Sequence, residues 1–237
     1  IDGQDGGNDY YRGTCFYAKK IEKAELPECD QYYLEFQGAN ASADVYVNGK
    51  KLASHDGGYS TWRVNVTDAL EADNLIVVAV ENGINERVYP QQADFTFYGG
   101  LYRDVNLIGV NNSHFDLDYY GGPGIMVTPT VNGADADVAV EVFLTNAQSG
   151  QELVYKLKDA DGNTVAEGKQ SASETKASFT ISYGNTFSFG SFLIDSLTAL
   201  LQASAFFKHT LSGFSSITLA NELFDNSLVV ETHLSKL

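Results

Sequence analysis

The 237-residue sequence is poor in cysteine and in clustered histidine, and each shortage excludes a class of site. Two cysteines, Cys15 and Cys29, cannot build a disulfide framework, and the four histidines are scattered without the Cys/His spacing of a zinc site. A phosphate-binding loop of the G-x-x-x-x-G-K-[ST] type is missing as well. We therefore expect no metal and no cofactor, and we expect both cysteines to be small buried residues within strands.

Basic residues are also scarce. Lys and Arg total 15 against 31 Asp and Glu, which gives a formal net charge of −16. A chain this acidic repels a phosphate backbone and an anionic lipid surface, so neither nucleic acid nor a membrane is an expected partner. The apolar stretch at 191–208 is too short and too polar for a membrane span. A neutral partner such as a sugar meets no such repulsion.

What the sequence does contain, over residues 14–182, is a series of segments typical of strands. Short runs rich in β-branched and aromatic residues alternate with Gly, Asn, Asp and Pro clusters, at a spacing of roughly 10–15 residues. Asn48-Gly49 separates two of these runs and favours a type I′ hairpin, whose central residues both need positive φ. Many short strands punctuated by turns predict an all-β sandwich fold.

The pattern changes twice along the chain. A Gly/Pro cluster near 111–124 predicts a linker or a sharp turn, and a second series of strands follows it, with a hairpin turn at Asp161-Gly162-Asn163. About 60 residues of this series indicate an immunoglobulin-like sandwich that is incomplete, since a whole one needs about 100. The remaining residues, 183–237, carry little charge, and the apolar spacing within 191–208 is compatible with a helix.

Three separated motifs of the first strand series carry a family resemblance. They are GANASADVYVNGKKLASHDGGYSTWRVNVTDAL, NLIVVAVENG and DFTFYGGLYRDVNL, in that order. Together they resemble the N-terminal sugar-binding domain of family 2 glycoside hydrolases, the β-galactosidases above all. The later run GGPGIMVTPTVNGADADVAVEVFLTNA resembles the immunoglobulin-like domain that follows it in that family.

The resemblance implies a domain plan. It places a galactose-binding-like jelly roll at 1–110, with the family's first strand missing, a partial immunoglobulin-like β-sandwich at 119–182, and an atypical tail at 183–237. A natural protein rarely begins with isoleucine, so we expect the chain to be cut from a longer one. Compartment stays open, with the cytoplasm slightly favoured over secretion.

The resemblance also implies that the chemistry lies elsewhere. The family hydrolyses glycosides with retention, using two glutamates on a (β/α)₈ barrel, and a barrel needs about 250 residues. We therefore expect no catalytic residue here and no turnover by this chain alone. Glu222 follows an asparagine, as the family's acid/base does, but it lacks the surrounding motif and is read as an ordinary glutamate.

Asp94 is the strongest candidate for a functional residue. Within DFTFYGGLYRDV it matches the aspartate that this domain contributes to the family's active site, and a carboxylate can accept hydrogen bonds from two sugar hydroxyls. Phe97 and Tyr98 could stack on the apolar face of the sugar. The alternatives are that Asp94 merely caps a turn and that the aromatics pack onto the sandwich.

Three functions remain open from the sequence. The chain is the non-catalytic N-terminal portion of a β-galactosidase-like hydrolase, which binds a β-galactoside or a related glycan within an oligomeric parent. Alternatively, it is a free-standing carbohydrate-binding module, or a structural or adhesion sandwich without a small ligand. The order of the motifs favours the first.

Overall fold

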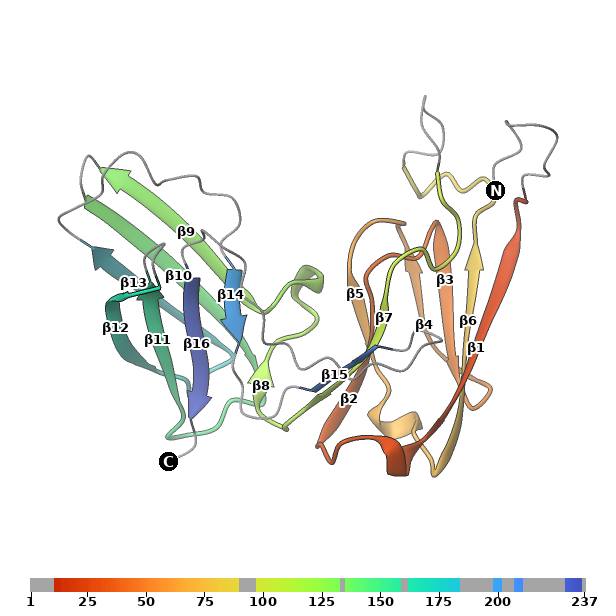
Figure 1. The fold of residues 1–237 in the computed structure, drawn as a ribbon, viewed down its shortest axis with the longest axis horizontal. Coiled ribbons are helices and arrows are strands. Elements are labelled where there is room, and N and C mark those ends of the chain that lie inside the picture. Colours follow the sequence, from red (N-terminus) through yellow and green to blue (C-terminus); the bar gives the residue numbers. More distant parts are fainter. Residues whose placement is uncertain are drawn as a thin grey trace. The chain divides into compact units, whose positions relative to one another are not determined.

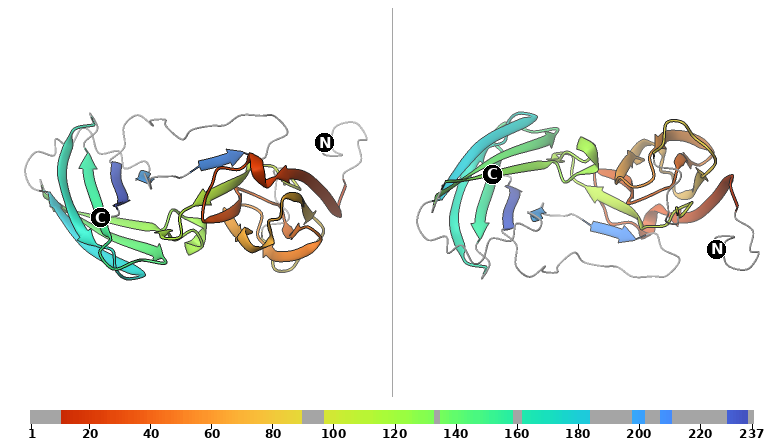
Figure 2. Two further views of the ribbon diagram at one scale, coloured as in Figure 1. Left: turned by 90° about the horizontal axis from the view of Figure 1, so that it is seen from below. Right: turned by 90° about the horizontal axis from the view of Figure 1, so that it is seen from above.

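The computed structural model describes residues 11–89, 97–132, 135–158 and 162–183, and the backbone of three further strands at 198–201, 207–210 and 229–235. Contacts divide the chain into two compact units, one built mainly from residues up to Gly109 and the other from Val110 onward. Each unit is a pair of β-sheets (Figure 1, Figure 2). Within the described part of the chain, helices are limited to single 3₁₀ turns, none long and apolar enough to cross a membrane.

Two four-stranded sheets make up the first unit, in the orders β1-β6-β3-β4 and β15-β7-β2-β5. The all-β sandwich predicted from the sequence is therefore confirmed. Its elements are β1 (Thr14–Glu22), η1 (Lys23–Glu25), β2 (Gln31–Phe36), β3 (Ser42–Val47), β4 (Lys50–Asp56), β5 (Trp62–Asn65), η2 (Thr67–Ala69), β6 (Asp73–Glu81), β7 (Val105–Val110) and β15 (Phe207–Thr210).

The predicted hairpin joins β3 to β4 as expected. Asn48 has φ 52° and Gly49 has φ 80°, so both central residues adopt the left-handed conformation that a type I′ turn requires. The Asn48 side chain also receives the amide of Leu75 and donates to the carbonyl of Ala69, which ties the turn to neighbouring segments. Local turn chemistry and these more distant contacts together hold the hairpin in place.

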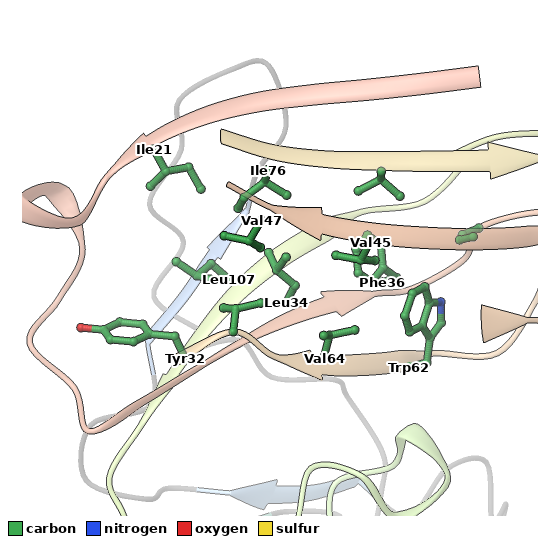
Figure 3. Close-up of a cluster of buried hydrophobic side chains, with 14 of the residues drawn as sticks. Ile21, Tyr32, Leu34, Phe36, Val45, Val47, Trp62, Val64, Ile76 and Leu107 are labelled. Atoms are coloured by element: carbon green, nitrogen blue, oxygen red, sulfur yellow. The ribbon is translucent and has the colours of Figure 1, made fainter. Parts of the chain in front are cut away.

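Alternating side chains of the strands fill the space between the two sheets. Leu34 and Phe36 of β2 meet Val45 and Val47 of β3 there, and Val64 of β5 closes the layer (Figure 3). All five are buried, and the first four are fully so. Because alternate residues point to opposite faces, the strand period of two places these side chains in one core.

Glu35 lies between two core residues of β2, so its side chain points from the outer face of the sheet. It is nevertheless only 5% exposed. Arg63, its register partner on β5, donates from Nε to Glu35 Oε2 at 2.9 Å, and Nη2 lies 2.8 Å from the same oxygen. Asn106 of β7 is fully buried and donates to Glu35 Oε1 at 3.0 Å. The outer face therefore holds a buried, hydrogen-bonded ion pair.

The second unit is also a sandwich. In one sheet β10 lies between β13 and the pair β8 and β9, and the other sheet has the order β12-β11-β16-β14. Alternate side chains of β10, such as Val138, Val140 and Val142, are buried in its core. Its elements are β8 (His114–Phe115), η3 (Tyr119–Gly121), β9 (Ile125–Asn132), β10 (Asp135–Thr145), β11 (Glu152–Lys158), β12 (Thr164–Ser171), β13 (Lys176–Tyr183), β14 (Thr198–Leu201) and β16 (Val229–Ser235).

The Gly/Pro cluster ahead of β9 makes the sharp turn that the sequence predicts. Gly121 and Gly124 have φ 64° and 73°, and a Cβ at Gly124 would stand 2.5 Å from the carbonyl oxygen of Asp116. Only glycine fits that second position. The hairpin predicted at 161–163 also forms, since β11 pairs with β12 antiparallel, with Gly162 at φ 83°; Asp161 lies outside the described residues.

Two expectations are corrected. The helix compatible with the spacing at 191–208 does not form where the backbone is described, since β14 pairs with β16 and β15 pairs with β7. A short apolar run suits a strand as well as a helix, so periodicity alone cannot separate them.

The second correction concerns the cysteines. Cys15 does lie in β1 but is exposed, because β1 is an edge strand. Cys29 is half-buried and precedes β2 rather than lying in it.

Candidate functional site

Three connections of the first unit meet at one end of its sandwich (Figure 1). They are 37–41 between β2 and β3, 57–61 between β4 and β5, and the described residues 82–89 and 97–104 of the connection between β6 and β7. These segments, with residues 11–13 ahead of β1, are called the loop end. The predicted site residues all belong to its longest connection. The loop end is thus the place where the sequence prediction can be compared with geometry.

The structure describes two of the three predicted site residues, Phe97 and Tyr98, and the role of all three stays a prediction. Asp94 lies outside the described residues. Phe97 is half-buried, whereas Tyr98 is 69% exposed and presents its ring to solvent. Tyr59, Tyr89 and Tyr11 are further exposed rings of the loop end. Exposed aromatic faces suit stacking on a sugar, and Tyr98 is placed where such stacking is open to it.

Asn40 holds residues 98–100, in the second part of this connection. Its Nδ2 donates to the carbonyl oxygen of Tyr98 at 2.8 Å, across 58 positions of the chain. Its backbone exchanges two hydrogen bonds with Gly100, of 3.0 and 2.9 Å. Gly100 has φ 80°, a left-handed conformation that glycine adopts without steric cost. Asn40 itself is buried, so its side-chain amide is held in one place within the loop end.

Two tyrosine hydroxyls reinforce this attachment. Tyr102 donates to the carbonyl of Gly58 at 2.6 Å, and the amide of Leu101 donates to the Tyr17 hydroxyl at 3.3 Å. The Arg103 guanidinium lies over the Tyr102 ring, 5.3 Å from its centroid, and reaches the Tyr59 carbonyl. Residues 98–103 are therefore bound to β1 and to the 57–61 connection as well as to Asn40.

Asp56, at the end of β4, holds residues 85–87 in the first part of the connection. Arg87 Nε donates to Asp56 Oδ2 at 2.6 Å, while Oδ1 accepts from Ser42 Oγ at 2.6 Å and from Asn85 Nδ2 at 3.3 Å. Hydrogen bonds from Arg87 and then from Ser42 hold the pKa of Asp56 well below its usual range. This carboxylate therefore stays ionised, and the attachment stays charged, throughout the neutral and mildly acidic range.

Trp62, the single tryptophan of the chain, stands where the core reaches the loop end (Figure 3). It is 7% exposed, so its ring packs within the core. Its ring stacks on Phe36, with centroids 4.4 Å apart, and on His55, with centroids 4.5 Å apart. His55 Nε2 lies 3.3 Å from Ser60 Oγ. Burial lowers the pKa of His55, although the neighbouring Asp56 carboxylate opposes the shift.

This stack predicts a pH-dependent signal from Trp62. His55 is neutral at pH 7, and protonation places a cation against the indole, which quenches its fluorescence. We expect emission to fall as pH drops below the ordinary histidine value of 6.5, with a midpoint below it. Because the unfolded chain binds that proton first, the His55 contribution to stability is lost over the same descent. Fluorescence titration of the native chain and of His55→Gln measures the change in emission, and denaturation at several pH values measures the change in stability. An unchanged fluorescence titration in His55→Gln would refute the assignment.

Among the described residues, no group of three or more His, Cys, Asp or Glu side chains could hold a metal ion. The described part of the loop end presents exposed tyrosine rings on segments that are held by hydrogen bonds. Sequence reasoning missed Asn40, Asp56, Arg87, Tyr17 and Tyr102, because each acts on a partner more than 30 positions away and no local pattern marks it.

Comparison with known proteins supplies the context for this site. Residues 10–115 match the family described as the glycosyl hydrolase 2 galactose-binding domain-like. A β-glucuronidase from Bacteroides fragilis is 31% identical over 163 residues, which cover 68% of this chain and 24% of that protein. A β-galactosidase from Thermoanaerobacter pseudethanolicus is 28% identical over 148 residues, covering 60% of this chain and 19% of that protein.

A solved structure matches nearly the whole chain. The crystal structure of an FMN-binding β-glucuronidase from Facaelibacterium prausnitzii L2-6 aligns with a TM-score of 0.72 and 31% identity, covering 99% of this chain and 34% of that one. The chain thus spans between a fifth and a third of the length of these proteins, and it matches their N-terminal part. The described residues form two sandwiches and no (β/α)₈ barrel.

Proposed function

Because residues 10–115 form the galactose-binding-like domain of a family 2 glycoside hydrolase, we propose that this chain is the non-catalytic N-terminal portion of such an enzyme and that its loop end borders a glycan-binding active site. The family match is the observation that carries the proposal. The geometry supports it, since the candidate residue Tyr98 is exposed on a segment that is tied firmly to the sandwich.

The proposed ligand is a β-linked glycoside whose reacting sugar is galactose or glucuronic acid, because the relatives include enzymes named for each. Asp94 accepts hydrogen bonds from the sugar hydroxyls. Phe97 and Tyr98 contact the apolar face of the ring. A charge-assisted hydrogen bond contributes about 1.5–3 kcal/mol, and in a dry site it also fixes the orientation of the sugar.

The chemistry of a retaining glycosidase separates the role proposed for this chain from the role of the catalytic barrel. Two carboxylates about 5–5.5 Å apart carry out glycosyl transfer and hydrolysis, and those residues belong to a barrel. This chain contributes to orientation, which raises the rate only if the sugar is held in a productive geometry. The isolated chain therefore turns over no glycoside.

The decisive experiment compares this chain with the longer protein encoded by its surrounding reading frame. We expect the 237-residue chain to release no chromophore from chromogenic β-galactosides and β-glucuronides, and the longer protein to release it from one of them. In the longer protein, Asp94→Asn is expected to lower kcat/KM about 10–100-fold, the loss of one charge-assisted hydrogen bond.

Asp73→Asn is the matched control, since Asp73 is exposed at the start of β6, the end of that strand remote from the loop end. It should leave kcat/KM unchanged. Turnover by the isolated chain, or full activity of Asp94→Asn, would overturn the proposal. Saturable sugar binding by the isolated chain with no active longer protein would identify a free-standing carbohydrate-binding module instead.

A further inference from the structure

We propose that Asn40 and Asp56 are positioning residues, which fix the two segments on either side of residues 90–96 and thereby set the affinity of the loop end for its glycan. The inference deepens the proposed function and rests on it for the identity of the ligand. The attachment itself is argued from this chain alone. Neither residue contacts the sugar in this scheme; each acts through the backbone that carries the candidate residues.

Asn40 is suited to hold residues 98–100 because it is buried and doubly engaged. Its side chain donates to Tyr98, and its own peptide groups pair with Gly100 in both directions. Its conformation is restricted by Gly58, where a Cβ would stand 2.4 Å from Asn40 Oδ1. An aspartate here would place a negative acceptor against the Tyr98 carbonyl, so only an amide or a similar donor can make this bond.

Asp56 holds the opposite flank, residues 85–87. Three different residues donate to its carboxylate, and Asn85 adds two further bonds by donating to Ser42 Oγ at 2.6 Å and accepting from the Arg87 amide at 3.0 Å. Arg87 is largely exposed, so the ion pair alone contributes little to stability. The network therefore sets where the segment lies more than how stable the unit is.

Asn40 and Asp56 lie in or next to regular strands, whereas residues 85–87 and 98–100 contain no strand. Asp56 ends β4, and Asn40 lies between β2 and β3, next to Ser42, which begins β3 and joins the Asp56 network. Side-chain supports add precision to a binding loop that has few backbone hydrogen bonds, and a misplacement of about 1 Å can cost about 100-fold in rate. One strand pair, β3 and β4, thus frames both flanks of the predicted site.

Hydrogen–deuterium exchange of the 237-residue chain tests the attachment directly. We expect Asn40→Ala to speed exchange of the Gly100 and Leu101 amides at least about tenfold, since opening then costs one buried hydrogen bond less, worth about 1 kcal/mol or more. We expect Asp56→Asn to act in the same way on the amides of Arg87 and Val88. Unchanged exchange at these amides would overturn the proposal.

Asn48→Gly is the matched control. It also deletes an asparagine side chain, here with three hydrogen bonds, and it keeps the positive φ of that position, but it lies at the opposite end of β3. It should lower stability without changing exchange at 87–88 or 100–101. If the control accelerates those amides equally, Asn40 and Asp56 act only through global stability, and the positioning role is refuted.

Steady-state kinetics of the longer protein test whether the attachment affects substrate affinity. We expect Asn40→Ala and Asp56→Asn to raise KM several-fold with a smaller change in kcat, and Asp56→Glu, which keeps the charge, to restore part of the loss. Normal KM in both variants, despite loosened amides, would refute the link to affinity. A longer protein that hydrolyses no glycoside removes the proposed function, whereas the exchange experiment still decides the attachment.

Discussion

Replacing Glu35 with alanine is expected to lower the free energy of unfolding of the first unit by about 3–5 kcal/mol. Glu35 and Arg63 have side chains only 7% and 9% exposed, and Asn106 shares the carboxylate. Removal of the acid leaves a guanidinium charge in a site with little water, and the Asn106 amide loses an acceptor. Both penalties exceed the modest net gain that a paired, buried ion pair supplies in the native protein.

Chemical denaturation followed by circular dichroism measures this loss. Glu35→Gln keeps the shape and an acceptor for Asn106 but removes the charge, so we expect an intermediate loss. Asp44→Ala is the surface control, because it removes the Asp44–Lys51 pair, whose side chains are 36% and 46% exposed. Exposed pairs contribute about 0–1 kcal/mol. Equal losses in Glu35→Ala and Asp44→Ala would show that the outer-face pair is accessible to water.

Local chemistry explains which parts of the fold the sequence could predict. The Asn48-Gly49 turn is a property of neighbouring residues, and it is confirmed. The strand β14 was missed because its apolar spacing suits two structures, and only pairing with the distant β16 decides between them. Cys15 was expected to be buried because composition cannot show that its strand lies at a sheet edge.

The candidate site, too, could be predicted from the sequence only in part. A family resemblance placed the site on the connection between β6 and β7, and the structure shows Tyr98 exposed on that segment. The residues that hold the segment could not be predicted, since Asn40 and Tyr98 lie 58 positions apart and an asparagine has no periodic pattern. The role of Asp94 stays a prediction. Function in such a loop depends on contacts that only the folded sandwich brings together.

Phe36→Ala is expected to destabilise the first unit by about 3–5 kcal/mol, the range for a buried aromatic replaced by alanine. Phe36 is fully buried and stacks on Trp62 at an interplanar angle of 17°. Truncation removes its burial energy, leaves a cavity between the sheets and deprives the indole of one neighbour. Denaturation followed by Trp62 emission, which reports only on the first unit, measures the loss, and the native emission should change as well.

Leu153→Ala is the matched control in the second unit, where Leu153 is fully buried in a separate core. We expect a loss of about 2–5 kcal/mol in that unit, seen by circular dichroism, with native Trp62 emission unchanged. The comparison separates two effects of a core truncation, since both variants create a cavity but only one adjoins the His55–Trp62–Phe36 stack. A loss below about 1 kcal/mol in Phe36→Ala would mean that the sheets close around the gap, and it would contradict the expected cost of the cavity.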